Sequence, residues 1–434
     1  MASFLQVLKN NPNYRYTWMG QVVSEIGDHF NNIAVFSLVL ANTHSGLAVS
    51  GVMLSRAVPA VLAGPIAGVL LDRLDRKKVM IASDLVRFVV ALGFILTVDG
   101  KSTASLYLLY GLSAVLMFAS PFFTSGRAAI LPTITTREEL HTANSLTQTT
   151  GWMTLTIGTF AAGAIVSKLG FKPAFLLNAV SFLFSAISIS RLHAATGAFR
   201  PAKKALTESD VVRPWHEYVE GLRYMRANPL IFGIALLGIG WASGGGAAQI
   251  LFSLFGELVF KRGAEGIGYI WGCAGIGLVL GGALGHWLGR TLSFDGYKRS
   301  VIVCYVVHGV AYIVFSQMQQ FGAALFFIGL SRAAVAVTSV MNFSQLLRHV
   351  SDNYRGRVFS TVESMVWSTM MVSMMVAGIT SQYYSPRTIG AWAGALSSLT
   401  AIFWAWAHYT GRLPEPKLEG IDPHEVEVHG EQTV

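Results

Sequence analysis

The residues best suited to chemistry in this sequence are polar side chains inside a long apolar segment. Glu25, Asp28, His29, Asn31 and Asn32 fall within eight residues. Carboxylates and imidazoles can take up and release protons, and amides can bind the polar groups of a ligand. Glu25 and His29 are four residues apart, as are Asp28 and Asn32, so each pair shares a helix face. Ionisable residues in a membrane span are costly and indicate function.

An arginine in the next apolar segment supplies a partner for these acids. Antiparallel packing of the two segments would bring Arg56 within about one helical turn of Asp28. The two residues could form a permanent structural pair. Alternatively, a conformational cycle could move Asp28 between apolar surroundings, which disfavour its charge, and the arginine, which favours it. Asp28, Glu25 and Arg56 are therefore the candidates for proton coupling.

Other polar or irregular positions could bind a substrate. Three glycines follow Ser243 in a later apolar segment, and Gln249 lies one turn on. Such glycines can expose the backbone at a binding site, although close helix packing would explain them equally well. Arg332 lies near the middle of its segment and could bind an anionic group or pair with a carboxylate. The candidate substrate-binding residues are Asn31, Asn32, Ser243, Gly245, Gln249 and Arg332.

The eleventh apolar segment is rich in methionine. Thioethers adapt to varied ligands, so this segment could line a cavity of broad specificity. Plain core packing or a lipid-facing surface fits the same pattern. The residues concerned are Met365, Met370, Met371, Met374 and Met375, with Trp367 among them and Glu363 nearer the start.

The overall composition places all these residues in a membrane protein. The chain has 434 residues, of which 53% are hydrophobic and 13% charged, whereas soluble proteins carry about 25% charged residues. The hydrophobic content also excludes disorder. The two cysteines lie in apolar runs, so neither a disulfide framework nor a zinc site is expected. No phosphate-binding loop with Gly-Lys-Ser/Thr follows a strand, and we expect neither an enzyme nor a bound cofactor.

Twelve apolar runs are long enough to cross a membrane as helices. About 20 residues are needed for one crossing, and the runs lack the alternation of barrel strands. Residues 1–15 before them look like a short interfacial helix. The runs cover roughly 16–40, 47–71, 79–98, 105–131, 141–166, 172–192, 229–256, 265–290, 299–317, 321–350, 357–383 and 387–410.

The distribution of cations predicts the orientation. With both termini in the cytoplasm, 23 of the 32 Lys and Arg residues fall in cytoplasmic segments and six in outside loops. This asymmetry follows the positive-inside rule. The formal net charge of +9 is then a topology signal facing anionic lipid, and no nucleic-acid partner is expected.

The chain divides into two similar halves. Asn11-Pro12 and Asn228-Pro229 are 217 residues apart, as are Gly68 and Gly285, and Arg73 and Arg290. Parallel repeats of this kind are a transporter architecture, with the substrate site near the midplane between them. The expected units are a six-helix bundle in 1–192, a cytoplasmic linker loop in 193–228, a second six-helix bundle in 229–411 and a disordered cytoplasmic tail in 412–434.

The densest cluster of charge follows the second apolar run. An acid beside four cations at a span end suggests a charge latch that holds a conformation, beyond simple membrane anchoring. Asp84 and Arg87, three residues apart on the next run, share a face close to this loop. The candidate latch residues are Gly68, Asp72, Arg73, Arg76, Lys77, Asp84 and Arg87.

These motifs resemble the major facilitator superfamily. Residues 68–78 resemble its Gly-x-x-x-Asp-Arg-x-x-Arg-Lys loop, and their Asp-Arg-x-Asp-Arg-Lys-Lys form is similar to the efflux branch that contains macrolide and enterobactin exporters. Residues 24–28, 126–132, 220–224 and 354–360 resemble other junctions of that branch.

The sequence departs from the superfamily at two motifs. Thr159 and Ala162 alter the Gly-Pro-x-x-Gly-Gly pattern of superfamily antiporters. Gly289 replaces the loop aspartate in the second half, so any latch built there lacks its acid.

The resemblance implies an all-α, multi-pass protein of the cell membrane, with twelve helices in two pseudo-symmetric six-helix bundles. It also implies a secondary transporter, and with the acidic first span it favours proton-coupled export of a drug- or siderophore-like amphipathic molecule by a monomer among membrane lipids. A lysophospholipid or other organic-anion transporter of the same fold, and a membrane sensor that does not transport, remain as alternatives.

Overall fold

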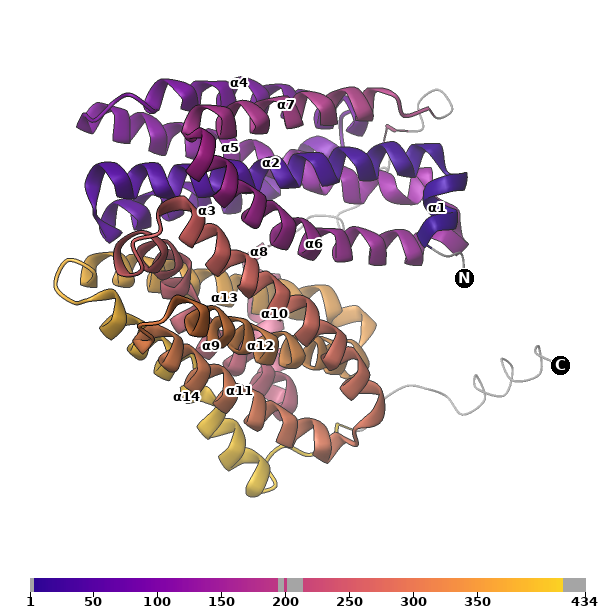
Figure 1. Cartoon of the computed structure of the whole chain (residues 1–434). Coiled ribbons are helices and arrows are strands. Elements are labelled where there is room, and N and C mark those ends of the chain that lie inside the picture. Colours follow the sequence, from indigo (N-terminus) through magenta and orange to yellow (C-terminus); the bar gives the residue numbers. More distant parts are fainter. Residues whose placement is uncertain (1–3, 194–198, 201–213, 417–434) are drawn as a thin grey trace.

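The computed structural model describes residues 4–193, 199–200 and 214–416, and every regular element in these ranges is a helix. Most of the tail expected to be disordered therefore lies outside the described residues. Figure 1 shows two helical bundles side by side, one formed by the first half of the chain and one by the second.

Twelve of the described helices are 18 residues or longer. They are α2 (Pro12–Thr43), α3 (Gly46–Leu71), α4 (Arg76–Gly93), α5 (Thr103–Ile134), α6 (Arg137–Leu169), α7 (Phe171–Ser190), α9 (Pro229–Leu254), α10 (Gly263–Thr291), α11 (Phe294–Gln317), α12 (Phe321–His349), α13 (Asp352–Thr380) and α14 (Pro386–Tyr409). A 3₁₀ turn, η1 (Phe94–Thr97), extends α4, and a π turn, η3 (Phe255–Val259), extends α9. The two shorter helices are α1 (Phe4–Asn10) and α8 (Pro214–Ala227).

Eleven of these helices are apolar and long enough to span a membrane. The helix α2 is the exception among the twelve, because polar residues occupy its middle. It is nevertheless packed against α6 and α7 inside the first bundle. The predicted all-α fold with twelve membrane helices in two bundles is confirmed.

Local sequence explains where several helices begin. Asn11 caps α2 by accepting a hydrogen bond from the Tyr14 backbone N–H, and Pro12 occupies the first turn, where its missing N–H costs nothing. Asp75 caps α4 in the same way. Thr136 and Glu139 form a reciprocal capping box at the start of α6. These caps separate consecutive helices with very short connections.

The two bundles, called the N half (α2–α7) and the C half (α9–α14), meet along two helix pairs. One pair is α6 with α10 and the other is α3 with α13. We call the end of the molecule that carries α1 and α8 the α8 side, and the other end the opposite side. The helix α1 lies at the right of Figure 1, so the opposite side is at the left.

The halves touch closely on the opposite side. The Ser50 hydroxyl of α3 donates to the carbonyl oxygen of Met374 on α13 at 2.9 Å, and Gly378 packs against Ser50. In the other pair, a Cβ on Gly268 would lie 2.6 Å from the Thr159 carbonyl oxygen and 2.8 Å from the Cα of Gly163. Backbones approach this closely only where side chains are small. The molecule is therefore closed on the opposite side.

The predicted linker 193–228 lies partly outside the described residues, and its last part forms α8. This helix packs on the first turns of α13: Glu220 and Arg357 form an ion pair at 2.7 Å, and the rings of Tyr224 and Tyr354 stack at 4.7 Å. The connection between the halves is thus attached to α13.

Beyond α14, Leu413 is buried in the C half and its carbonyl oxygen accepts a hydrogen bond from Lys298 at 3.2 Å.

Candidate functional site

A cavity of about 850 Å³ separates α3 from α13 between the closed contacts and the α8 side. Residues from Met53 to Pro65 form one wall, and residues from Ser360 to Met374 form the other. A smaller pocket of about 240 Å³ shares Met53, Arg56 and Gln249 with it and extends between α2, α6 and α10. We call the two spaces together the central cavity.

The inner end of the central cavity is rich in unused hydrogen-bond donors. Arg56 Nη1 and Trp271 Nε1 are buried and have no hydrogen-bond partner among the described residues. The other guanidinium nitrogen, Arg56 Nη2, contacts the Met117 sulfur at 3.8 Å, and the Phe36 ring lies 5.9 Å from the guanidinium carbon. Gln249 lines the same space. A buried donor without a partner costs free energy, so these groups suit an anionic ligand.

Asp28 lies close to Arg56 without pairing with it. Asp28 forms no ion pair within 4.0 Å with any residue that the structure describes. The cations whose charge acts on its carboxylate are Arg87 and, less strongly, Arg56. The Asp28 carboxylate therefore has cations near it but no direct ion-pair partner among the described residues.

Asp84 and Arg87 form a buried ion pair inside the N half. Their side chains are 0% and 3% exposed, and the guanidinium carbon lies 4.8 Å from the centre of the Phe123 ring and 4.4 Å from that of Phe182. The sequence suggested that these two residues belong to the loop latch. The structure places them in the core, where Arg87 lies within electrostatic reach of Asp28.

The loop itself is tied to its own half. Arg76 Nη1 donates to the Ala129 carbonyl oxygen at 3.0 Å, and Lys77 donates to the carbonyl oxygens of Ser190 and Leu192 at 2.7 and 2.8 Å. No atom of the described chain beyond its own helix lies within 4 Å of a Cβ built on Gly68. Asp72 and Arg73 are exposed. In this conformation Gly68 is therefore not packed against the C half, and the loop is held by hydrogen bonds within the N half.

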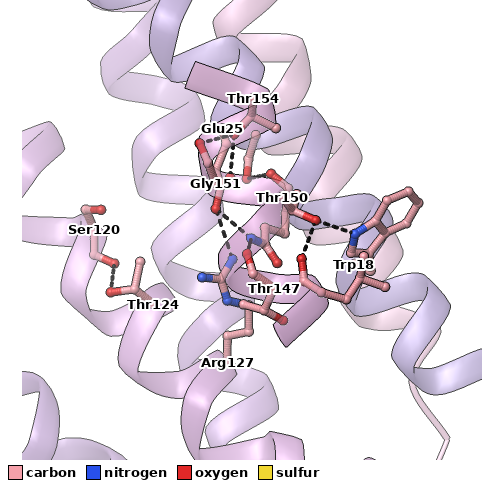
Figure 2. A network of polar contacts seen from close by, with 12 residues as sticks. Trp18, Glu25, Ser120, Thr124, Arg127, Thr147, Thr150, Gly151 and Thr154 are labelled. Atoms are coloured by element: carbon pink, nitrogen blue, oxygen red, sulfur yellow. Dashed lines mark hydrogen bonds and ion pairs between the residues drawn. The ribbon is translucent and has the colours of Figure 1, made fainter. Parts of the chain in front are cut away.

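Glu25 is the centre of a polar network between α2, α5 and α6 (Figure 2). One carboxylate oxygen accepts from Arg127 Nη1 at 3.3 Å and from Gln21 at 2.9 Å, and the other accepts from Thr154 at 2.8 Å. Beside this network, Trp18 of α2 donates to Thr150 of α6 at 2.8 Å. Glu25 is thus fixed by several donors, whereas Asp28 is not.

Sequence reasoning missed Arg127 as a partner of Glu25. Arg127 lies near the end of the apolar run 105–131, and because α5 continues to Ile134, this arginine stands on the membrane helix and reaches Glu25. The resemblance of residues 126–132 to a superfamily junction was the signal that marked this arginine. Among the described residues, the cavity-lining Trp271 had no comparable sequence signal.

We expect Glu25→Ala to destabilise the protein, because Arg127, Thr154 and Gln21 would lose a charged acceptor. Hydrogen bonds to charged groups contribute about 1.5–3 kcal/mol, so the free energy of unfolding should fall by about 2 kcal/mol. Thermal unfolding of the purified protein in detergent measures the change. The exposed Glu138 offers the control Glu138→Ala, and equal melting temperatures for the two variants would contradict the network's role.

The candidate residues of the C half occupy different places. Arg332 is 8% exposed and lies 5.0 Å from the centre of the Phe252 ring, outside the lining of the central cavity. Gly245 packs near Met370 and Trp241. The Ser243 hydroxyl donates to the Gly240 carbonyl oxygen at 2.6 Å. Gln249 is the candidate of this group that lines the central cavity.

The two candidate amides of α2, Asn31 and Asn32, also have different surroundings. Asn32 lines the smaller pocket of the central cavity. Asn31 is 0% exposed, and neither of its side-chain polar atoms has a hydrogen-bond partner among the described residues. The two neighbours differ because they point to different faces of α2.

Residues 17–360 match the family model of the Major Facilitator Superfamily. The chain is 24% identical over 383 residues to the putative bacilysin exporter of Bacillus subtilis (strain 168), covering 85% of this chain and 89% of that protein. It is 21% identical to the macrolide efflux protein A of Streptococcus pyogenes, covering 83% and 87%.

A solved structure of a bacterial homologue of the iron transporter ferroportin, in an inward-facing state, superposes with a TM-score of 0.69. The identity is 18%, over 90% of this chain and 98% of that one. This likeness concerns the fold. With a cavity between two six-helix bundles and a family match over most of its length, the chain belongs to the major facilitator superfamily.

Proposed function

We propose that this protein is a proton-coupled exporter that moves an amphipathic small molecule across the cell membrane by alternating access. The relatives named as exporters or efflux proteins support the direction of transport. In this proposal the α8 side faces the cytoplasm with both termini, and a monomer embedded in lipid carries out the cycle. The described conformation is then the one that receives substrate from the cytoplasm.

The observation that carries the proposal is that Arg56, at the wall of the central cavity, and the nearby Asp28 each lack an ion-pair partner among the residues that the structure describes. Asp28, Arg56 and Arg87 lie on α2, α3 and α4 of the N half, so rocking of the halves leaves their spacing unchanged but alters the water and the C-half surface that face this group across the central cavity. Because opposite charge favours the ionised carboxylate and apolar surroundings disfavour it, such a change would drive proton uptake or release at Asp28.

The loop residues have a separate role in this proposal. Gly68, Asp72 and Arg73 are exposed or lie in open space while the cavity is open to the α8 side. Closure of that side would bring them against the C half, where Asp72 could interact with a helix N-terminus. The latch would then stabilise the alternative conformation, in which the central cavity opens to the outside.

Two alternative functions, anion transport without proton coupling and ligand sensing without transport, predict different results from the proposed exporter. An organic-anion or lysophospholipid transporter would use the unpaired donors at the inner end of the cavity, without needing proton exchange at Asp28. A membrane sensor would bind a ligand without moving it. Both are separated from the proposed exporter by measurements of flux.

Proteoliposomes that contain the full chain and a trapped pH indicator test the proposal. Ethidium, chloramphenicol and carboxyfluorescein represent cationic, neutral and anionic substrates. We expect at least one compound to move and to carry a counter-flow of protons, which a protonophore abolishes. Substrate movement without proton movement would contradict the coupling, and binding without flux would support a sensor.

A further inference from the structure

We propose that the central cavity selects zwitterionic amphiphiles, with an anionic group held at Arg56 and a cationic group held at Glu363. This inference rests on the proposed transport function and names its class of substrate. It follows from two opposite charges that line one cavity at different depths.

The inner end of the cavity suits an anion. Arg56 supplies a positive charge, and buried donors of Arg56 and Trp271 have no partner in the described chain. A carboxylate would accept from both and satisfy them.

The outer end of the cavity suits a cation. Glu363 lies on the same cavity wall as the hydroxyls of Ser360 and Ser364, one turn or less away. Its side chain is exposed, and it forms no ion pair within 4.0 Å with another residue of the described ranges. A carboxylate flanked by hydroxyl oxygens favours an ammonium group.

Arg56 and Glu363 form no ion pair with each other, and their backbone positions lie at different depths in the cavity. Ser50 contacts both Met374 and Gly378, and so fixes the relative depth of α3 and α13. On α3, Arg56 lies six residues from Ser50. On α13, Glu363 lies eleven residues from Met374 and fifteen from Gly378, the two residues that Ser50 contacts. With a rise of 1.5 Å per residue, the two positions differ in depth by about 10 Å. A ligand that carries both charges would bridge this distance, helped by the two flexible side chains.

The wall between the two charges is apolar and adaptable. Met53, Met117 and Met371 line it together with Trp367. Thioethers and an indole ring accommodate varied apolar groups. The cavity therefore recognises the two charged ends and leaves the middle of the ligand loosely specified.

Three dansyl compounds with a common skeleton test the inference. Nα-dansyl-lysine carries both charges, Nα-dansyl-norleucine carries the carboxylate alone, and dansylcadaverine carries the ammonium alone. Their fluorescence is titrated with the purified full chain in nanodiscs, without a proton gradient. We expect the zwitterion to bind about tenfold more tightly than either relative, because charge-assisted hydrogen bonds are the strong ones.

Substitutions at Arg56 and Glu363 assign the two ends. Arg56→Gln should weaken binding of the zwitterion and the carboxylate compound, and Arg56→Lys should restore part of it. Glu363→Gln should weaken binding of the zwitterion and the ammonium compound. The exposed residues Arg299 and Glu138 provide the matched controls Arg299→Gln and Glu138→Gln, which should bind like the wild type.

The inference is overturned if the zwitterion fails to bind, if it binds no better than a singly charged relative, or if Glu363→Gln leaves its affinity unchanged. Any of these results would leave proton-driven export of a singly charged compound intact. Conversely, a failed proton flux would not change the binding titrations, so the two proposals fail separately.

Discussion

An Asp28→Asn protein is expected to lose proton-driven accumulation of substrate while still exchanging substrate across the membrane. Asparagine keeps the size and much of the hydrogen bonding of aspartate but cannot titrate. A pH gradient of about two units would let the wild type concentrate its substrate about 100-fold for each proton exchanged, since one pH unit corresponds to about 1.36 kcal/mol. The variant should reach only equal concentrations on the two sides.

Proteoliposomes loaded with a substrate that the wild type transports provide both measurements. Uptake driven by the pH gradient should vanish in Asp28→Asn, whereas counterflow of labelled against unlabelled substrate should continue. Asp28→Glu, which restores a titratable group, should recover part of the driven uptake. Wild-type accumulation by a well-expressed Asp28→Asn protein would remove Asp28 from the coupling mechanism.

A Gly268→Val substitution is expected to shift the conformational equilibrium away from the described state. The added side chain would meet the Thr159 carbonyl oxygen and the Cα of Gly163, which are backbone atoms that cannot rotate aside. Overpacking costs about 1–3 kcal/mol, so the equilibrium constant for the state closed on the opposite side should fall by about 5- to 150-fold. The alternative conformation, in which the α8 side is closed, should become more populated.

The rate at which an impermeant maleimide labels a cysteine in the cavity measures this shift. The cysteine is introduced as Ser364→Cys after Cys273 and Cys304 have been replaced by serine. Labelling from the α8 side should slow by about tenfold in Gly268→Val, and less in Gly268→Ala.

Gly289→Val is the matched control for the Gly268 substitution. Gly289 is on the same helix, and its added Cβ would have Met341 Cγ as its nearest neighbour at 4.0 Å. Equal labelling rates for Gly268→Val and Gly289→Val would show that the α6–α10 contact does not set the conformation.

The charges of the N half could be identified from the sequence, but their pairing could not. The spacing of Glu25 and Asp28 suggested proton chemistry for both residues. In the structure Glu25 accepts from Arg127, Gln21 and Thr154, whereas Asp28 has no ion pair within 4.0 Å in the described chain. The difference arises because partners more than 100 residues away in the sequence contribute from α5 and α6.

The cavity residues show the same limit. Arg56 and Arg332 looked alike in the sequence, each a lone arginine in an apolar span. Arg56 lines the central cavity, and Arg332 lies against Phe252 in the core of the C half. A helix rotated by a fraction of a turn would exchange such environments, and nothing local in a uniformly apolar segment fixes that rotation.

The sequence by itself determined the helical fold, the number of long helices and the division into two halves. These features depend on the length of apolar runs, on caps and on repeated motifs, which are local properties of the chain. Only the tertiary structure decided which faces line the central cavity, which charges pair and which side is closed. Those features depend on the packing of α3 with α13 and α6 with α10, where residues distant in sequence approach one another through small side chains.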